Sequence, residues 1–564
     1  MKTKGIVPMN TLEIISMPFT HSSANALYGK PYSDFPVVYF LNNNSMVYIG
    51  ETAAVRNRMK NHLKNPERKS LDKMTVIFHE KFNRSATYNI ETKLINYFLA
   101  DERYKLQNKS QTADSVSHNY YNKPFYNEKL FNKLWDQLKE KNYVTHSREV
   151  IENKDIFKLS PFKELSMEQI ELKERIIDVC EKHIKDEVPF VFLVKGEAGT
   201  GKSVVLSAVF NRIQELAKEK SSALHDTNNF LLVNHSEMLK TYQKIARKVK
   251  ALKKNNFDKP TSFINKRKKT NQKADIVFVD EAHLLLTKAD SFNNFKENNH
   301  LEEIIKNSKI VILVFDDKQV LKMKSYWDIN KLMNLVDSKH SEEYVLTNQF
   351  RMHASYEMIS WIDHFVEKKI LPVPKKETFD FQIFDSAAKM YRKICEKNNR
   401  FGLARMVSTF DYVHKKDGQT YYIKEDQLKL PWNTTMGDST WAEREATISE
   451  VGSIYTIQGF DLNYVGVILG PSVTYDYEND QLKIITGNYK DTEAFKGKDE
   501  FDDPEFIKET IILNSINVLL KRGIKGLYIF ASDPALRAHL IKLYETRTDA
   551  YGRMRVAEDK SDYH

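Results

Sequence analysis

The stretch FVFLVKGEAGTGKS, residues 190–203, decides the fold of most of this 564-residue chain. Its first six residues have the apolar pattern of a buried strand, and a helical pattern over Val204–Leu216 follows directly. A strand, a glycine-rich turn and a helix in this order surround phosphates with backbone N–H groups. In such a loop, Lys202 reaches the terminal phosphates and Ser203 is a ligand for Mg²⁺. The other loop residues expected to bind a nucleotide are Gly196, Gly199, Thr200 and Gly201.

An acidic pair follows the apolar run 276–279, where Asp280 and Glu281 stand at the end of a predicted strand. A carboxylate at this place holds Mg²⁺, directly or through water, and its neighbour polarises the attacking water. We therefore assign metal binding to Asp280 and Ser203 and water activation to Glu281. Together with residues 196–203, which we name the phosphate loop, the pair predicts an ATPase that uses ATP and Mg²⁺.

Strand-length apolar runs alternate with helical patterns from Ser166 onward, which is typical of parallel sheets covered on both faces. One set of runs is 190–195, 230–233, 276–279, 310–315 and 344–346, and a second set is 404–407, 465–469 and 527–530. We predict an α/β chain with a small α/β domain at 1–111 and two tandem parallel-sheet domains at 161–355 and 356–550. Residues 112–160 are expected to be a connector with some helical content, and 551–564 a polar, frayed tail.

The composition, with 41% hydrophobic and 29% charged residues, indicates a globular protein. No apolar run is long enough for a membrane-spanning helix, and the first residues lack the pattern of a secretory signal. Two cysteines, Cys180 and Cys395, exclude a disulfide framework and a cysteine-rich zinc site. We expect a cytoplasmic protein without a membrane partner.

The formal charge of +10 is concentrated in one segment. Residues 244–273 hold twelve Lys or Arg and a single acid, Asp258, so the segment carries +11 and the remaining chain −1. Such a segment is expected to bind a polyanion. We expect Lys266–Lys269 to contact nucleic-acid phosphates, with Phe257 and Phe263 nearby to stack on bases. A solvated loop is the alternative interpretation.

The order of the motifs resembles that of superfamily 1 helicases, particularly the Schlafen-related group. The segments that carry the resemblance are 165–169, 196–203, 280–281, 315–319, 347–351, 455–461 and 517–522. It implies that both parallel-sheet domains are RecA-like. Phe315 departs from the usual sensor motif, which has Gly there, and the segments between motifs leave little room for accessory subdomains. Translocation or ATP-gated clamping is therefore favoured over processive unwinding.

The same resemblance assigns roles to five further residues. Gln169 would read the adenine edge, Gln319 would belong to the sensor strand, and Gly459 to the motif that couples ATP to nucleic acid. Arg351 and Arg522 would contact the γ-phosphate. Because both arginines lie far along the chain, we expect them to reach it only when the two RecA-like domains close.

The front domain places ionisable residues on helical stripes that should be apolar. A helix beginning near Ala53 puts Arg58 and His62 on the face of Val55 and Met59, and a second helix puts Glu91 beside an apolar set. Such groups are costly to bury unless they are paired or functional. A buried salt bridge is the structural alternative.

These residues resemble the GIY-YIG nuclease family. The matching positions are Tyr39, Tyr48, Arg58, His62, Glu91 and, near the end of the domain, Asn108; Val37 replaces the first motif glycine. The resemblance implies that Glu91 binds a single Mg²⁺, with Mn²⁺ as an alternative, and that Arg58 neutralises the scissile phosphate. A tyrosine assisted by Arg58 or His62 would activate water, and the choice between Tyr39 and Tyr48 stays open.

We therefore expect an ATP-dependent nuclease–helicase that acts on DNA rather than RNA, in restriction of foreign DNA, as in antiviral defence, or in repair. One alternative is a motor whose front domain binds nucleic acid without cleaving it. A second is an ATP-gated switch that assembles with protein partners. The sequence leaves open the oligomeric state, the direction of movement and the cleavage specificity.

Overall fold

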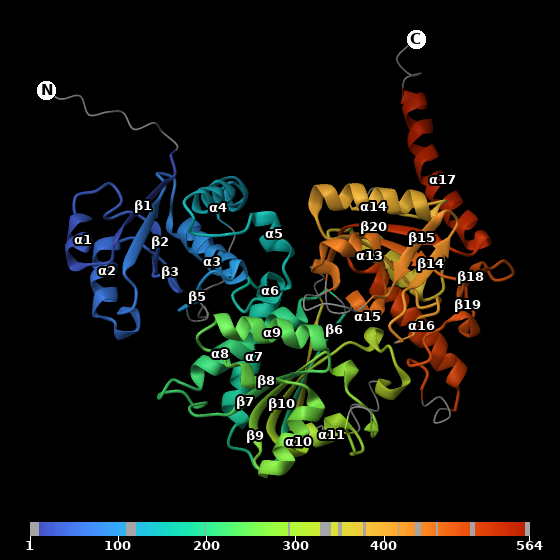
Figure 1. The fold of residues 1–564 in the computed structure, drawn as a ribbon, viewed down its shortest axis with the longest axis horizontal. Coiled ribbons are helices and arrows are strands. Elements are labelled where there is room, and N and C mark those ends of the chain that lie inside the picture. The colour runs from blue at the N-terminus through green and yellow to red at the C-terminus, as the bar shows by residue number, and fades with distance from the viewer. Residues whose placement is uncertain are drawn as a thin grey trace.

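The computed structural model describes residues 11–108, 120–197, 199–291, 294–327, 335, 340–347, 352–375, 379–415, 417–434, 441–457, 461–496 and 502–558. Three main sheets follow one another along the chain, a mixed sheet in the front domain and two largely parallel sheets behind it (Figure 1). The mixed α/β class agrees with the sequence prediction. Among the described residues, no helix has both the length and the apolarity needed to cross a bilayer.

The front domain contains a five-stranded sheet flanked by helices. Its elements are β1 (Glu13–Pro18), α1 (His21–Ala26), β2 (Val37–Asn42), β3 (Met46–Thr52), α2 (Val55–Lys64), β4 (Lys73–Phe78), α3 (Arg84–Asp101) and β5 (Lys105–Leu106). The strand order is β1-β4-β2-β3-β5. The predicted strand pair is the antiparallel hairpin β2–β3, in which Tyr39 lies opposite Gly50. β1, β4 and β5 were not predicted and extend this hairpin into a sheet.

The connector is helical, as expected. It contains a π-helical turn (Phe125–Leu130), α4 (Phe131–Glu140), α5 (Arg148–Asn153) and α6 (Asp155–Lys158). The buried stripe of α4, with Trp135 at its centre, packs against Tyr97 and Phe98 of α3. The connector is therefore packed on the front domain.

The first parallel-sheet domain has the strand order β11-β6-β10-β9-β7-β8, and all its strand pairs are parallel. The strands are β6 (Phe190–Gly196), β7 (Asn229–Val233), β8 (Phe257–Asp258), β9 (Ala274–Asp280), β10 (Ser308–Phe315) and β11 (Ser341–Leu346). The helices are α7 (Met167–His183), α8 (Lys202–Leu216), α9 (Ser236–Lys248), α10 (Pro260–Thr270) and α11 (His300–Lys306). All five strands of the first predicted set are present. The carboxyl ends of β6, β9 and β10 lie at one sheet edge, and this brings the motifs together.

The second parallel-sheet domain is built on seven strands in the order β12-β20-β17-β13-β16-β15-β14. The strands are β12 (Asp380–Ile383), β13 (Ala404–Ser408), β14 (Tyr421–Glu425), β15 (Leu428–Trp432), β16 (Val451–Gly452), β17 (Leu462–Leu469) and β20 (Gly523–Ala531), with a separate hairpin of β18 (Val473–Asp476) and β19 (Gln481–Ile484). The helices are α13 (Tyr356–Val366), α14 (Ala387–Phe401), α15 (Ile454–Ile457), α16 (Pro504–Leu520) and α17 (Pro534–Glu558). α17 extends to Glu558, so residues 551–558 of the expected polar tail are helical.

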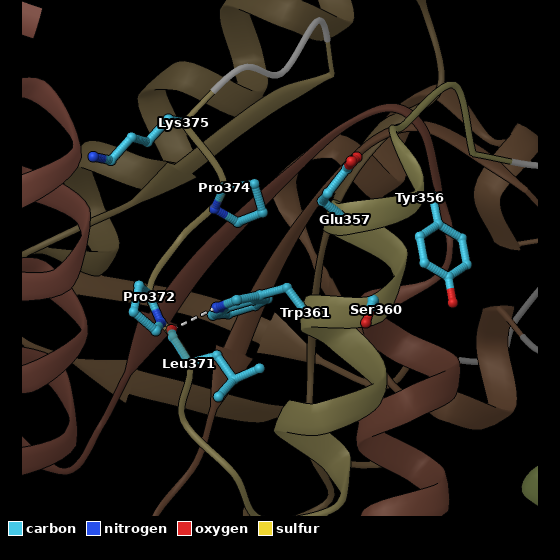
Figure 2. A pocket seen from close by; sticks show the side chains of 8 residues that line it. All are labelled: Tyr356, Glu357, Ser360, Trp361, Leu371, Pro372, Pro374 and Lys375. Carbon is cyan, nitrogen blue, oxygen red and sulfur yellow. Dashed lines mark hydrogen bonds between the residues drawn. The ribbon is translucent and has the colours of Figure 1, made fainter.

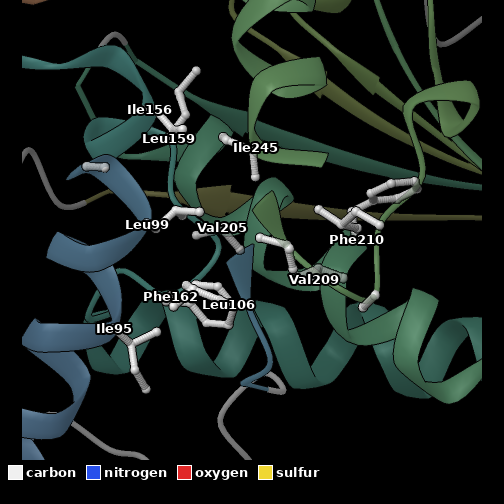
Figure 3. Packing of buried hydrophobic residues seen from close by; sticks show 14 of the residues in the cluster. Ile95, Leu99, Leu106, Ile156, Leu159, Phe162, Val205, Val209, Phe210 and Ile245 are labelled. Carbon is white, nitrogen blue, oxygen red and sulfur yellow. The ribbon is translucent and has the colours of Figure 1, made fainter. Parts of the chain in front are cut away.

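One apolar core joins the front domain, the connector and the first parallel-sheet domain. Ile95 and Leu99 of α3 belong to the same buried cluster as Val205 and Val209 of α8 (Figure 3). Further members drawn in that view are Leu106, Ile156, Leu159, Phe162, Phe210 and Ile245. α8 directly follows the phosphate loop. Through this cluster the helix is joined to the core of the front domain. The front domain and the first parallel-sheet domain thus form one packed body.

The second parallel-sheet domain has its own core and meets the connector through polar contacts. Lys158 Nζ donates to the Asp461 carbonyl at 2.9 Å, and the Asp155 amide donates to Glu443 at 2.9 Å. Polar interfaces of this kind rearrange more readily than a shared apolar core. Relative motion is therefore expected between the second domain and the rest of the chain.

His300, at the start of α11, gives the first parallel-sheet domain a pH-dependent stability. It is fully buried, accepts the Leu286 N–H at Nδ1 (3.0 Å) and lies 2.9 Å from the Thr261 hydroxyl through Nε2. Burial, opposed by Asp290, lowers its pKa to about 3. Because the folded pKa is below the unfolded value of about 6.5, stability is complete above that pH and falls as the pH drops.

We predict that unfolding free energy falls by about 2 kcal/mol between about pH 7.5 and 5 through His300 alone. Urea unfolding at both pH values measures the loss. In His300→Asn, where the amide oxygen can accept the Leu286 N–H, the loss should shrink by that amount. If His300→Asn and the unaltered protein lose the same unfolding free energy between these two pH values, the pKa of His300 is not lowered by folding and the prediction is wrong.

Candidate functional site

The phosphate loop joins the end of β6 to the start of α8. Gly199 and Gly201 adopt φ values of +96° and +79°, which side-chain-bearing residues rarely adopt. A Cβ at position 201 would lie 2.4 Å from Nε2 of Gln169, which itself donates to the Thr200 carbonyl at 3.0 Å. The remaining amide oxygen of Gln169 caps α7 at Ser166. Gln169 thus contacts the loop, while its predicted contact with adenine stays a prediction.

The ammonium group of Lys202 lies against two carbonyls of the phosphate loop and the Asp316 carboxylate. Nζ donates to the carbonyls of Gly196 (2.5 Å) and Glu197 (2.8 Å) and lies 3.1 Å from Asp316 Oδ2. Gln319 donates to the same carboxylate oxygen at 2.6 Å. Burial would raise the pKa of Asp316, but Lys202 and Gln319 outweigh it and hold this pKa below its ordinary value. The loop lysine and the sensor strand therefore form one charged network.

Asp280 ends β9 directly beside the start of α8. It is fully buried, accepts the Ser203 hydroxyl at 3.1 Å and the Tyr242 hydroxyl at 2.7 Å, and its pKa is raised by burial and by Glu281. The oxygen atoms of Asp280 and Ser203 lie in contact with each other, and Mg²⁺ prefers such oxygen ligands. Glu281 has a left-handed φ of +52°, and its carboxylate lies 3.2 Å from Nε2 of the buried His283. Asp280 and Glu281 thus lie in one buried site, but Asp280 contacts hydroxyl groups whereas Glu281 contacts an imidazole.

The second parallel-sheet domain contributes two cations to this site. Arg522 is buried, and its Nη2 lies 3.5 Å from Oε1 of Gln319. Its neighbour Lys521, also buried, donates to Glu197 at 3.1 Å and to Asp363 at 2.6 Å. The predicted approach of Arg522 to the first domain is therefore present in this structure. Arg351 and Gly459 lie outside the described residues.

Two residues at the site were missed from the sequence, Tyr242 and Lys521. Tyr242 lies on the buried stripe of α9, where an aromatic residue looks like ordinary core. Lys521 precedes Arg522 and shows its buried position only through its contacts in the folded chain. Neither residue carries a local sequence signal.

The front domain gathers its predicted residues between β2, β3 and α2. Arg58 Nε donates to the Tyr39 hydroxyl at 3.0 Å, and that hydroxyl lies 2.8 Å from Nε2 of His62. The Arg58 guanidinium also reaches the Tyr48 hydroxyl at 3.5 Å. Burial, followed by Arg58 and Arg68, lowers the pKa of His62 to about 4, so its imidazole is neutral at neutral pH.

Glu91, on α3, faces the same cluster. Burial raises its pKa to about 8, the Glu51 carboxylate adds to the rise, and Arg58 opposes it. Asn108 accepts from the Ile49 N–H (3.0 Å) and donates to the Ile49 carbonyl (2.8 Å), so it fastens the chain beside β3. Among the described residues, no group of three or more His, Cys, Asp or Glu side chains is arranged to hold a metal. A cation at Glu91 would therefore depend on water and substrate oxygens, as Mg²⁺ commonly does.

The expected stacking role of two aromatic residues in the basic segment is wrong. Phe257 and Phe263 are both buried, Phe257 against Phe210 and Phe263 against Phe230, because they fill the core under β8 and α10. Neither ring is available to a base.

A hollow of about 440 Å³ lies on the second parallel-sheet domain, beside the start of α13 (Figure 2). Tyr356 at its rim is 81% exposed, while Trp361 is buried and donates from Nε1 to the Leu371 carbonyl at 2.9 Å. Its other lining residues are Glu357, Ser360, Pro372, Pro374 and Lys375. Since none of them is hydrogen-bonded to the described residues of the phosphate loop, we assign the hollow no part in the nucleotide site.

Comparison with known proteins places the two parallel-sheet domains in a family. The model for "Schlafen group 3, DNA/RNA helicase domain" matches residues 189–533, and this match does not reach the front domain. The uncharacterized protein YPL245W of Saccharomyces cerevisiae is 41% identical over 428 residues, which cover 70% of this chain and 94% of the yeast protein.

Likenesses among solved structures are weak. The Pif1 helicase from Candida albicans aligns with a TM-score of 0.26 at 12% identity over 68% of this chain and 99% of that chain. The helicase MrfA, solved bound to DNA, aligns with a TM-score of 0.24 at 10% identity over 68% of this chain and 48% of that one. The sequence matches carry the assignment: the chain belongs to the Schlafen group 3 family of DNA/RNA helicase domains.

Proposed function

We propose that the protein is an ATP-driven nucleic-acid translocase or helicase, acting on DNA, with a metal-dependent nuclease as its front domain. The observation that carries the motor assignment is the contact of Arg522 with Gln319 across two parallel-sheet domains. A cation supplied by a second domain stabilises charge on a transferring phosphoryl group only while the domains are together. Hydrolysis and domain movement are thereby linked.

Within the motor, the phosphate loop would hold the nucleotide and Lys202 its terminal phosphates. Asp280 and Ser203 would hold Mg²⁺, which supplies charge neutralisation on the phosphates. Glu281 would orient the attacking water. Arg522 and Arg351 would contact the γ-phosphate, and Gln319 would act as part of the sensor strand; Arg351 lies outside the described residues. Tyr242 would position Asp280 through its hydroxyl hydrogen bond.

In the front domain, a difference in burial supports different roles for the two tyrosines. Tyr39 is fully buried and holds Arg58 and His62, whereas Tyr48 is half-buried at the edge of the cluster. We assign water activation to Tyr48 and a positioning role to Tyr39. Glu91 would bind the metal ion, Mg²⁺ or Mn²⁺, which stabilises the leaving oxygen. Arg58 would neutralise the scissile phosphate.

The motor assignment predicts ATP hydrolysis that is stimulated by nucleic acid. Steady-state phosphate release is measured with and without single- and double-stranded DNA and RNA. Stimulation by a protein partner, with indifference to every nucleic acid, would instead favour a switch. No ATP hydrolysis under any of these conditions would exclude the proposal.

Arg522→Lys should lower turnover on the order of 10³-fold, because the charge remains but the guanidinium geometry is lost. Binding of a fluorescent ATP analogue should stay close to that of the unaltered protein. Lys525→Ala, which removes an exposed cation on β20, the strand that begins directly after Arg522, is the control. Equal loss of turnover in both variants would place Arg522 outside the reaction.

A further inference from the structure

The cations of the basic segment, residues 244–273, are not equally neutralised by ion pairs. In its later half, Lys266 pairs with Asp258 at 2.6 Å, and Lys268 pairs with Glu297 at 2.6 Å and Glu303 at 2.8 Å. In its first half, residues 244–254 contain six bases and no acid, and only Lys250 of these six forms an ion pair with a carboxylate of the described residues. The polyanion-binding capacity expected of the segment is therefore greatest in residues 244–254.

This first half lies at the junction with the front domain. Val249 forms a parallel β-bridge with Leu106, the last residue of β5, and Lys248 Nζ donates to the Glu102 carbonyl. On the other side, Lys218, just beyond α8, donates to the Ala251 carbonyl at 2.7 Å. In Figure 1, β5 lies at the edge of the front domain that faces α8 and α9.

These contacts bring four exposed lysines together, which we name the junction cluster: Lys105, Lys218, Lys250 and Lys253. The four come from three separate segments of the chain. Burial, followed by the charges of Lys253, Lys250 and Lys105, lowers the pKa of Lys218, although Glu215 opposes them. The cations are therefore close enough to repel one another.

The junction cluster is poorly neutralised. Lys250 pairs with Glu67 at 2.9 Å, but within the described part of the chain no carboxylate forms an ion pair with Lys105, Lys218 or Lys253. Glu215, the acid that acts on Lys218, is itself paired with Arg212 at 3.5 Å. Like charges held together by the fold favour a ligand with regularly spaced negative charges.

A chain of contacts links the junction cluster to the front-domain site. Glu67, the partner of Lys250, lies 3.5 Å from Arg68, whose guanidinium lies 4.0 Å from the ring centre of Tyr48. Arg68 is buried and donates to Gln107, immediately beyond β5, at 2.9 Å. Side-chain contacts through Glu67 and Arg68 thus connect the junction cluster to Tyr48, the assigned water-activating residue.

We propose that the junction cluster binds the phosphate backbone of the nucleic-acid strand that enters the front-domain site. This inference rests on the proposed nuclease function and adds the path of its substrate. Because the front domain and the first parallel-sheet domain share one core, the path is fixed relative to the phosphate loop. The motor would then present a strand to the nuclease at a constant position.

The test compares the double variant Lys218→Gln/Lys253→Gln with Lys269→Gln/Lys273→Gln. The control pair lies in the same basic segment, is exposed and loses the same charge. Affinity for a fluorescent single-stranded DNA oligonucleotide is measured between about 50 and 200 mM salt. We expect roughly 10- to 100-fold weaker binding for the junction variant and a salt slope smaller by about 1.4, with a clearly smaller effect for the control.

Equal affinity and salt slope in the junction variant and the unaltered protein would overturn the proposal, as would an equal loss in the control pair. ATP hydrolysis without nucleic acid should remain unchanged in both variants, which verifies the fold. Cleavage should be slowed at low DNA concentration and restored at saturation. If the unaltered protein binds DNA through the cluster but never cleaves it, the nuclease assignment fails while the cluster stands as a nucleic-acid site.

Discussion

Lys202→Ala is expected to reduce ATP hydrolysis by on the order of 10³-fold, because it removes the cation that contacts the terminal phosphates. The substitution also leaves Asp316 buried without its ionic partner; the side chains of this pair are 8% and 1% exposed. Losing one partner of a buried pair costs about 3–5 kcal/mol of stability. A loss of activity could therefore come from unfolding as well as from chemistry.

A second variant separates these two effects. In Lys202→Ala/Asp316→Asn, no uncompensated carboxylate remains, and Gln319 can still donate to the asparagine oxygen. We expect this variant to recover much of the lost unfolding free energy in urea while its ATP hydrolysis remains near background. Lys220→Ala, an exposed lysine beyond α8, serves as the control for charge. Normal hydrolysis by Lys202→Ala would exclude the phosphate loop as the nucleotide site.

The parts of this fold that could be predicted are those in which the chain carries its own signal. β6, β9 and β10 are buried on both faces, so each reads as an uninterrupted apolar run followed by a motif. β12 and β14 stand at the two edges of their sheet and β15 lies beside β14, where alternating or mixed residues give a weak pattern. Central strands were therefore found and several peripheral ones were not.

At the two sites, too, residues with a local sequence signal were predicted and residues without one were missed. The phosphate loop and the Asp280–Glu281 pair are contiguous, and the helical spacing of Arg58 and His62 is local. Tyr242 and Lys521 act through contacts made only after the sheets assemble. Which cations of the basic segment are neutralised was also not predictable. Glu297 and Glu303 pair with Lys268 from about thirty residues away in sequence. Charge counted along a sequence does not reveal which charges are paired.

Glu91→Gln is expected to reduce DNA cleavage by about 10³-fold or more, since an amide replaces the carboxylate that would bind the metal ion. The amide has nearly the same shape, and the pKa of Glu91, raised to about 8 by burial, shows that its surroundings disfavour the charged form. The variant should therefore unfold at the same or a slightly higher urea concentration. Loss of cleavage without loss of stability is the distinguishing result.

Cleavage is measured on single- and double-stranded DNA with Mg²⁺ or Mn²⁺, with and without ATP, beside Glu80→Gln as an exposed control. ATP hydrolysis by Glu91→Gln should equal that of the unaltered protein, because Glu91 lies outside the motor. Cleavage that persists in the variant would place the metal site elsewhere or reveal a contaminating nuclease. If the unaltered protein binds DNA but cleaves none under any of these conditions, the front domain is a binding module. The cluster of Arg58, His62 and Glu91 would then serve only to hold that module together.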